Sequence, residues 1–281
     1  MQFDLPGTIG VPDGRYLARE DDGERVLVIE TLGAPPPPRR RRRRSKEAEA
    51  GTDPGSVALT RITAIRAHEP FESEADAAEW LERAIASDDS VDAAVGEGLD
   101  LLNRALHAHA VASADPLGTE LRASMAANVR VGHGSGKEVA ASRFSAAREV
   151  DVRAGASPRR RRDEELRPQE RIAAILGGRE QLDTCETLIL RARADLDASR
   201  YREAALQLRV ALEATLVELD GALADPGHEE DMGDLEARRK EAGEAANAAL
   251  HGELDVDQER QVVELTEICE RVLRRRRVLR G

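Results

Sequence analysis

A glycine-rich stretch that ends in lysine, VRVGHGSGKEVA, is the first place where this chain carries residues that could bind phosphate. A phosphate-binding P-loop needs four residues between its first glycine and the Gly-Lys pair, followed by a serine or threonine that binds Mg²⁺. Here three residues separate Gly132 from Gly136, and Glu138 occupies the hydroxyl position, where its charge would repel a nucleotide. We therefore predict a flexible turn between a helix ending near Arg130 and an extended segment, RFSAAREV.

The histidines and cysteines do not form a metal or nucleophile pattern. His107 and His109 are two residues apart, which on a helix points them about 200° apart, so they cannot share a metal ion. Cys185 and Cys269 fall in separate predicted helices, with no CxxC motif and no histidine at ligand spacing. We expect two buried free thiols, no metal and no cofactor.

Runs of consecutive arginines could contact a nucleic-acid backbone, although the chain has a formal net charge of −12. The first run follows four prolines inside the segment 33–55 and consists of Arg39, Arg40, Arg41, Arg42, Arg43 and Arg44. Without interleaved aromatic residues such a run would bind any sequence and release it in high salt. Because prolines and adjacent like charges prevent local folding, we predict a disordered insertion at 33–55 and keep nucleic-acid binding as an alternative.

Two further runs, Arg159–Arg162 and Arg274–Arg277, have simpler explanations. Only three of the 42 basic residues are lysines, a bias typical of a GC-rich bacterial genome, which produces arginine runs without selection for function. Residues 274–277 also end a predicted helix, where positive charges complement the helix dipole.

The composition predicts the elements that must position these residues. The chain is 41% hydrophobic but only 2% aromatic, so its core must consist of aliphatic side chains and alanine, mostly between helices. In residues 1–150, GRYLARE, ERVLVIETLG and SVALTRITAIRAH have the pattern of strands. We expect a small α+β domain there, with a three-stranded antiparallel sheet covered by the helices SEADAAEWLERAIA and SVDAAVGEGLDLLNRALHAHAVASA. The first of these helices opens with Ser73 followed three residues later by Asp76, close to a capping box.

The second half reads as helix throughout. After a basic and acidic linker at 151–167, residues 168–281 contain five amphipathic segments separated by Gly177–Gly178, Gly221 and Asp225–Pro226. The fourth segment, MGDLEARRKEAGEAANAALHGEL, has Leu235 and Leu250 as its main large anchors. We predict an α+β, mostly α, protein that ends in an antiparallel bundle of about five helices with coiled-coil-like packing.

One stretch of this bundle, DASRYREAALQLRVALE, resembles the second half of a tetratricopeptide repeat. Tyr201, Ala204, Leu208 and Ala211 keep the aromatic, small, large, small spacing of that repeat. The resemblance covers about one repeat, whereas a solenoid needs about three. It implies a single, tightly packed helical hairpin.

A second resemblance is to the HEPN domains, helical bundles found in many nucleases and nucleotide-binding modules. In that family a YxEAxxxLRxALE-type helix precedes a helix with Arg-Asn-x-x-x-His; this chain has YREAALQLRVALEATL and then GEAANAALHGEL. Asn247 and His251 match the family's spacing, but Ala246 replaces the arginine that would hold a phosphate. The resemblance implies a ribonuclease in which His251 transfers protons and Asn247 orients it or the phosphate, or else an inactive relative.

Taken together, these patterns favour a non-catalytic protein that binds a protein partner, or a second copy of itself, through the helical bundle. The first residues have no basic and apolar leader, and no apolar segment reaches membrane-spanning length, so we expect a cytoplasmic protein without membrane contact. The alternatives are a HEPN-like ribonuclease or degenerate RNA-binding or nucleotide-binding module, and sequence-nonspecific nucleic-acid binding through the arginine runs.

Overall fold

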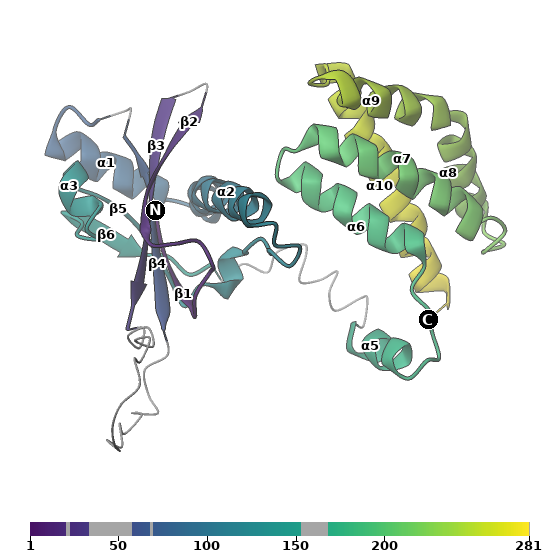
Figure 1. Ribbon diagram of the computed structural model, residues 1–281, viewed down its shortest axis with the longest axis horizontal. Coiled ribbons are helices and arrows are strands. Elements are labelled where there is room, and N and C mark those ends of the chain that lie inside the picture. Colours follow the sequence, from purple (N-terminus) through teal and green to yellow (C-terminus); the bar gives the residue numbers. More distant parts are fainter. Residues whose placement is uncertain (21–22, 34–57, 68–69, 153–167, 281) are drawn as a thin grey trace, which may run out of the picture. The chain divides into compact units, whose positions relative to one another are not determined.

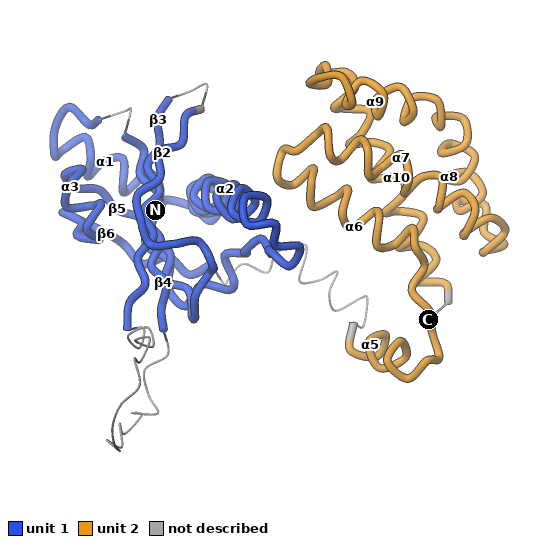
Figure 2. The backbone as a smooth tube through the Cα atoms, viewed as in Figure 1, with its two compact units in different colours: residues 1–155 blue, residues 156–281 orange. Residues whose placement is uncertain are grey.

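The computed structural model describes residues 1–20, 23–33, 58–67, 70–152 and 168–280. The chain divides into two compact units, unit 1 (Met1–Gly155) and unit 2 (Ala156–Gly281), and has a mixed α+β fold (Figure 1, Figure 2). The runs Arg39–Arg44 and Arg159–Arg162 lie outside the described residues, as do nearly all of the predicted insertion 33–55 and linker 151–167.

Unit 1 contains a six-stranded antiparallel sheet in the order β2-β3-β4-β1-β5-β6, instead of the predicted three strands. The strands are β1 (Gln2–Pro6), β2 (Gly14–Glu20), β3 (Gly23–Leu32), β4 (Leu59–Arg66), β5 (Asn128–His133) and β6 (Ala146–Glu149). Strands β2, β3 and β4 coincide with the predicted three. The sequence analysis missed β1, and it assigned β5 partly to a helix and partly to a flexible turn. It predicted the segment RFSAAREV, which contains β6, as extended but did not place it in the sheet.

Two helices of unit 1 cover one face of this sheet. The helices are α1 (Glu74–Ala84) and α2 (Asp88–Ser113), followed by the short helices η1 (Ala123–Met125) and α3 (Gly136–Val139). Phe3 stands opposite Ile62 and Val129 in the sheet register, so all three share a face, and they pack with Leu81 of α1 and Leu102 of α2 in one buried core. Ser73 caps α1 as the sequence predicted, because its side chain accepts a hydrogen bond from the backbone N–H of Asp76.

The other face of the central strand holds a buried charge. Asp4 is 6% exposed and accepts hydrogen bonds from Arg61 Nε at 2.7 Å, Arg61 Nη2 at 3.0 Å and Arg130 Nη2 at 3.2 Å. The hydrogen bond with Asp4 raises the pKa of Arg61 above its usual value. Because a buried carboxylate without partners would be costly, these two arginines from β4 and β5 stabilise β1 between its neighbours.

Unit 2 consists of six described helices where the sequence predicted five. They are α5 (Pro168–Leu176), α6 (Thr184–Asp197), α7 (Tyr201–Glu218), α8 (Pro226–Ala237), α9 (Arg239–His251) and α10 (Val256–Arg280). Large buried side chains from α6, α7, α8 and α10 form one core with the alanines of α9, including Ile189, Leu208, Leu212, Leu235 and Leu265. None of the described side chains of α5 belongs to that core.

The extra helix arises because the predicted fourth segment is two helices, α8 and α9. Asp225 was read as a stop, but its carboxylate accepts a hydrogen bond from the backbone N–H of His228 and Pro226 occupies the first helical position, so the pair starts α8. The backbone leaves helical geometry at Arg238, with φ −94° and ψ 5°, which separates α8 from α9. Leu235 is fully buried, but Leu250, the other predicted anchor, is 62% exposed.

Candidate functional sites

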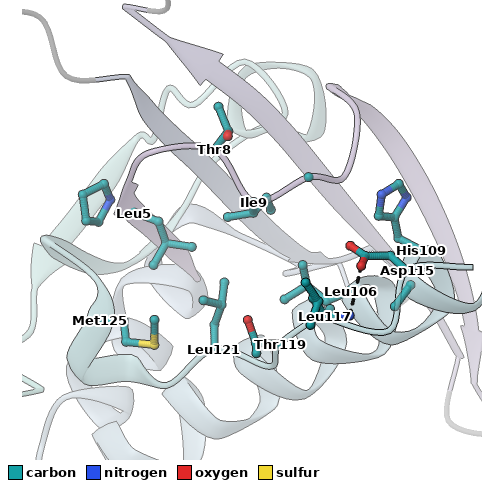
Figure 3. Close-up of a pocket in the computed structure, with 14 residues that line it drawn as sticks. Leu5, Thr8, Ile9, Leu106, His109, Asp115, Leu117, Thr119, Leu121 and Met125 are labelled. Atoms are coloured by element: carbon teal, nitrogen blue, oxygen red, sulfur yellow. Dashed lines mark hydrogen bonds between the residues drawn. The ribbon is translucent and has the colours of Figure 1, made fainter. Parts of the chain in front are cut away.

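A cavity of about 300 Å³ opens on unit 1 between the end of β1, the last turns of α2 and the segment 115–125 (Figure 3). Polar and apolar atoms share its wall about equally, and Leu5 and Leu106 at its base are buried. Leu117 and Met125, which also line it, are 82% and 50% exposed. The cavity is therefore apolar at its base and open to solvent at its mouth.

Backbone geometry and a side-chain clamp place the segment 115–125 against α2. Ala114 adopts the left-handed conformation, with φ 52°, and this reverses the chain after α2. Asn103 of α2 then holds Leu121 in both directions: its Nδ2 donates to the Leu121 carbonyl at 3.0 Å, and the Leu121 N–H donates to its Oδ1 at 2.8 Å. Each polar group of this pair is satisfied, so the wall of the cavity is fixed without a ligand.

Two titratable side chains, His109 and Asp115, line the cavity together with the hydroxyls of Thr8 and Thr119 (Figure 3). Asp115 Oδ1 accepts a hydrogen bond from the backbone N–H of Leu117 at 3.0 Å. Within the described part of the chain, neither a cysteine nor a serine lines the cavity. A cavity with apolar side chains at its base and a carboxylate at its edge is suited to binding a ligand.

Sequence reasoning did not find this cavity. It established only that His107 and His109 cannot share a metal ion; the structure has His107 exposed and His109 half-buried in the cavity wall. The only sequence feature that marked this region was Asp115–Pro116, which predicts a turn after α2. Such turns are common at helix ends, so this feature does not indicate a cavity.

The two residues of the HEPN-like motif lie one turn apart on α9, and both are exposed. They share a face, as their spacing of four predicts. Ala246, which stands where the HEPN family has an arginine, is 2% exposed and faces the interior of the bundle. The position that should supply a cation to the phosphate therefore points away from Asn247 and His251.

Three arginines of the run near the end of α10, Arg275, Arg276 and Arg277, pair with acidic residues of the bundle, whereas Arg274 is exposed. Arg275 donates to Asp225 Oδ1 at 3.1 Å and to Asp231 Oδ2 at 3.2 Å. The hydrogen bond from Arg275 holds the pKa of Asp225 below its usual value. Arg276 pairs with Asp183, which precedes α6. Arg277 donates to Glu186, a buried residue of α6, at 3.3 Å. The helix-dipole explanation was thus incomplete, because ion pairs also tie this end of α10 to α6 and α8.

Both cysteines are free and fully buried in the core of unit 2, as the sequence predicted. Burial is the main cause that raises the pKa of Cys185 and of Cys269 to about 12. Glu218 contributes at Cys185 because its carboxylate accepts a hydrogen bond from that thiol. Since the thiolate is the reactive form, neither residue is suited to nucleophilic catalysis.

The glycine-rich stretch 129–140 forms β5 and the single turn α3. His133 is 8% exposed, and its ring lies edge-on to Phe71 with 6.3 Å between the centroids. Lys137 and Glu138 are exposed on α3. The stretch therefore completes the sheet and does not form a phosphate-binding loop.

Among the helices in the described part of the chain, none combines the length and apolar character that a membrane crossing requires. The described residues also contain no group of three or more histidine, cysteine or acidic side chains placed to hold a metal ion.

Comparison with protein-family models, with curated proteins and with solved structures found no match for this chain.

Proposed function

We propose that this protein is a non-catalytic interaction module that binds a protein partner, or a second copy of itself, through the outer face of α7. The supporting observation is a stripe of apolar side chains on that face: Leu206, Val210 and Val217 are 37%, 55% and 80% exposed. Their spacings of four and seven residues place them on one side of the helix. On the opposite side of α7, Leu208 and Leu212 are buried in the bundle core.

The outer face of α9 is more polar than this face of α7. The exposed side of α9 carries mainly polar residues, including Lys240, Glu244, Asn247 and His251. Single exposed apolar residues are common, but several on one face of a helix can mark an interaction surface. Burying a valine or leucine side chain contributes about 1.5–3 kcal/mol, so even this narrow stripe could anchor a partner.

The test is to replace the stripe with charge and follow association. We expect the double variant Val210→Glu/Val217→Glu to lose a binding partner captured from the native host, or to lose self-association measured by light scattering. The control is Asn247→Glu on the outer face of α9, which should keep both. If circular dichroism shows a folded double variant whose partners and oligomeric state equal those of the unmodified protein, the proposal is wrong.

A HEPN-like ribonuclease is the alternative, supported by the exposure of Asn247 and His251 on one helical face. Purified protein incubated with total RNA beside a His251→Ala control separates the two functions. RNA loss in the unmodified protein alone would favour the enzyme, whereas equal loss in both samples, or none in either, would reject it.

Nucleic-acid binding through Arg39–Arg44 is a further alternative, and it rests on the sequence alone because this run lies outside the described residues. About six phosphate contacts would lower the affinity by roughly 10³-fold or more between 50 and 200 mM salt. Replacing the run with glutamine should abolish such binding. Binding that persists after the replacement would belong to another surface.

A further inference from the structure

We propose that the cavity of unit 1 binds a small molecule with an apolar chain and a positively charged amine head. The volume sets the size of this ligand. At about 30 Å³ for each water molecule, 300 Å³ holds about ten waters, which suits a ligand of about ten non-hydrogen atoms or fewer. That is too small for a folded partner or a nucleotide.

The wall determines the apolar part of the ligand. Leu5 and Leu106 close the base, while the rim residues Leu117 and Met125 are the most exposed large apolar side chains around the opening. A short alkyl chain seated between them would remove apolar surface from water on both the protein and the ligand. Because Asn103 already holds the wall in place, little ordering of the protein opposes binding.

Charge determines the head group. Among the residues that the structure describes, no arginine or lysine lines the cavity, and the titratable residues in its wall are His109 and Asp115. Asp115 Oδ1 accepts the Leu117 N–H, and no hydrogen bond from a described residue reaches Oδ2. This carboxylate can therefore accept a hydrogen bond from an ammonium group and would repel a carboxylate ligand.

The experiment measures three probes of equal chain length by calorimetry or by NMR titration of the full chain at about pH 8. Hexylamine carries the positive head, hexanol a neutral head and hexanoate a negative head. We expect hexylamine to bind about tenfold more tightly than hexanoate, with hexanol between them, and the preference to shrink as salt is added.

Variants locate the binding. Asp115→Asn should make the affinities of the three probes nearly equal, and the control Asp92→Asn, which removes an exposed carboxylate of α2 outside the cavity, should keep the preference. Thr119→Trp should fill the mouth and weaken all three probes. The inference is overturned if no probe binds up to its solubility limit, if hexanoate binds as tightly as hexylamine, or if Asp115→Asn retains the preference.

Discussion

Two glycines of α2 allow a sharp test of how β1 packs against the helix. Gly96 and Gly98 both lie in the middle of α2, where replacing glycine with alanine stabilises a helix by about 0.8–1.0 kcal/mol. A Cβ added at Gly96 would meet no atom within 4 Å. At Gly98 it would lie 2.9 Å from Met1 Cγ and 3.0 Å from Phe3 Cε2, closer than carbon atoms pack.

The two substitutions should therefore differ in their effect on the stability of unit 1. Phe3 is 1% exposed and β1 is held between β4 and β5, so the sheet cannot move away easily, and overpacking costs about 1–3 kcal/mol. We expect Gly96→Ala to stabilise unit 1 by about 1 kcal/mol. Gly98→Ala should range from neutral to about 2 kcal/mol destabilising, because the same helical gain offsets part of the strain.

The assay is urea unfolding followed by the fluorescence of Trp80, the only tryptophan, which packs against the core of unit 1. The difference between the two variants, about 1–3 kcal/mol, isolates the packing cost because both gain the same helix propensity. If Gly98→Ala stabilises unit 1 as much as Gly96→Ala does, the close approach of β1 to α2 is wrong.

Three further predictions concern unit 2. A Cβ at Gly227 would lie 1.7 Å from Arg275 Nη1, so Gly227→Ala should displace that guanidinium from its aspartates and lower the melting temperature of unit 2, whereas Gly233→Ala, with open space around it, should not. Burial raises the pKa values of Cys185 and Cys269 in the folded state from 9 to about 12. The stability that the two protonated thiols contribute is therefore fully present below pH 9 and is lost as pH rises toward 12. The free energy of unfolding should fall by up to about 1.4 kcal/mol per thiol for each pH unit in that range. A double cysteine-to-alanine variant should lose that part of the alkaline destabilisation in urea titrations; an unchanged pH profile would contradict the assignment. Residues 168–281 expressed alone should melt cooperatively by circular dichroism, and a broad melt would mean that the bundle needs residues 1–155 for its core.

Local patterns predicted those elements whose cause is local. The alternation of β-branched and polar residues indicated β2, β3 and β4, and Ser73 marked the start of α1. The apolar periodicity of 168–281 likewise indicated helices, although Asp225 was mistaken for an end when it is the cap of α8. Aspartate is common both in turns and as the cap at the start of a helix. The residue type alone therefore does not distinguish the two roles, and only the conformation of the neighbouring backbone does.

The missed strand β1 shows why local patterns were insufficient elsewhere. Both of its faces are buried, and Gln2 and Asp4 sit where an apolar residue would be expected. Gln2 donates to Thr63, and Asp4 accepts from Arg61 and Arg130, partners up to 126 residues away in the chain. Burial of such polar groups is tolerated only when distant partners satisfy them, and a local pattern cannot predict that.

The amino-acid sequence by itself determined the α+β class, the helical second half and the buried thiols, because periodicity and residue size act over a few neighbouring positions. Only the tertiary structure decided which side chains are buried, which are paired within the protein and which line a cavity. It turned Ala246 inward, paired the end of α10 with acids of α6 and α8, and brought Leu5 beside His109 and Asp115 to form a cavity. Each of these outcomes depends on contacts between segments that are far apart in the sequence. Such contacts form only when the whole chain packs, so local sequence patterns cannot predict them.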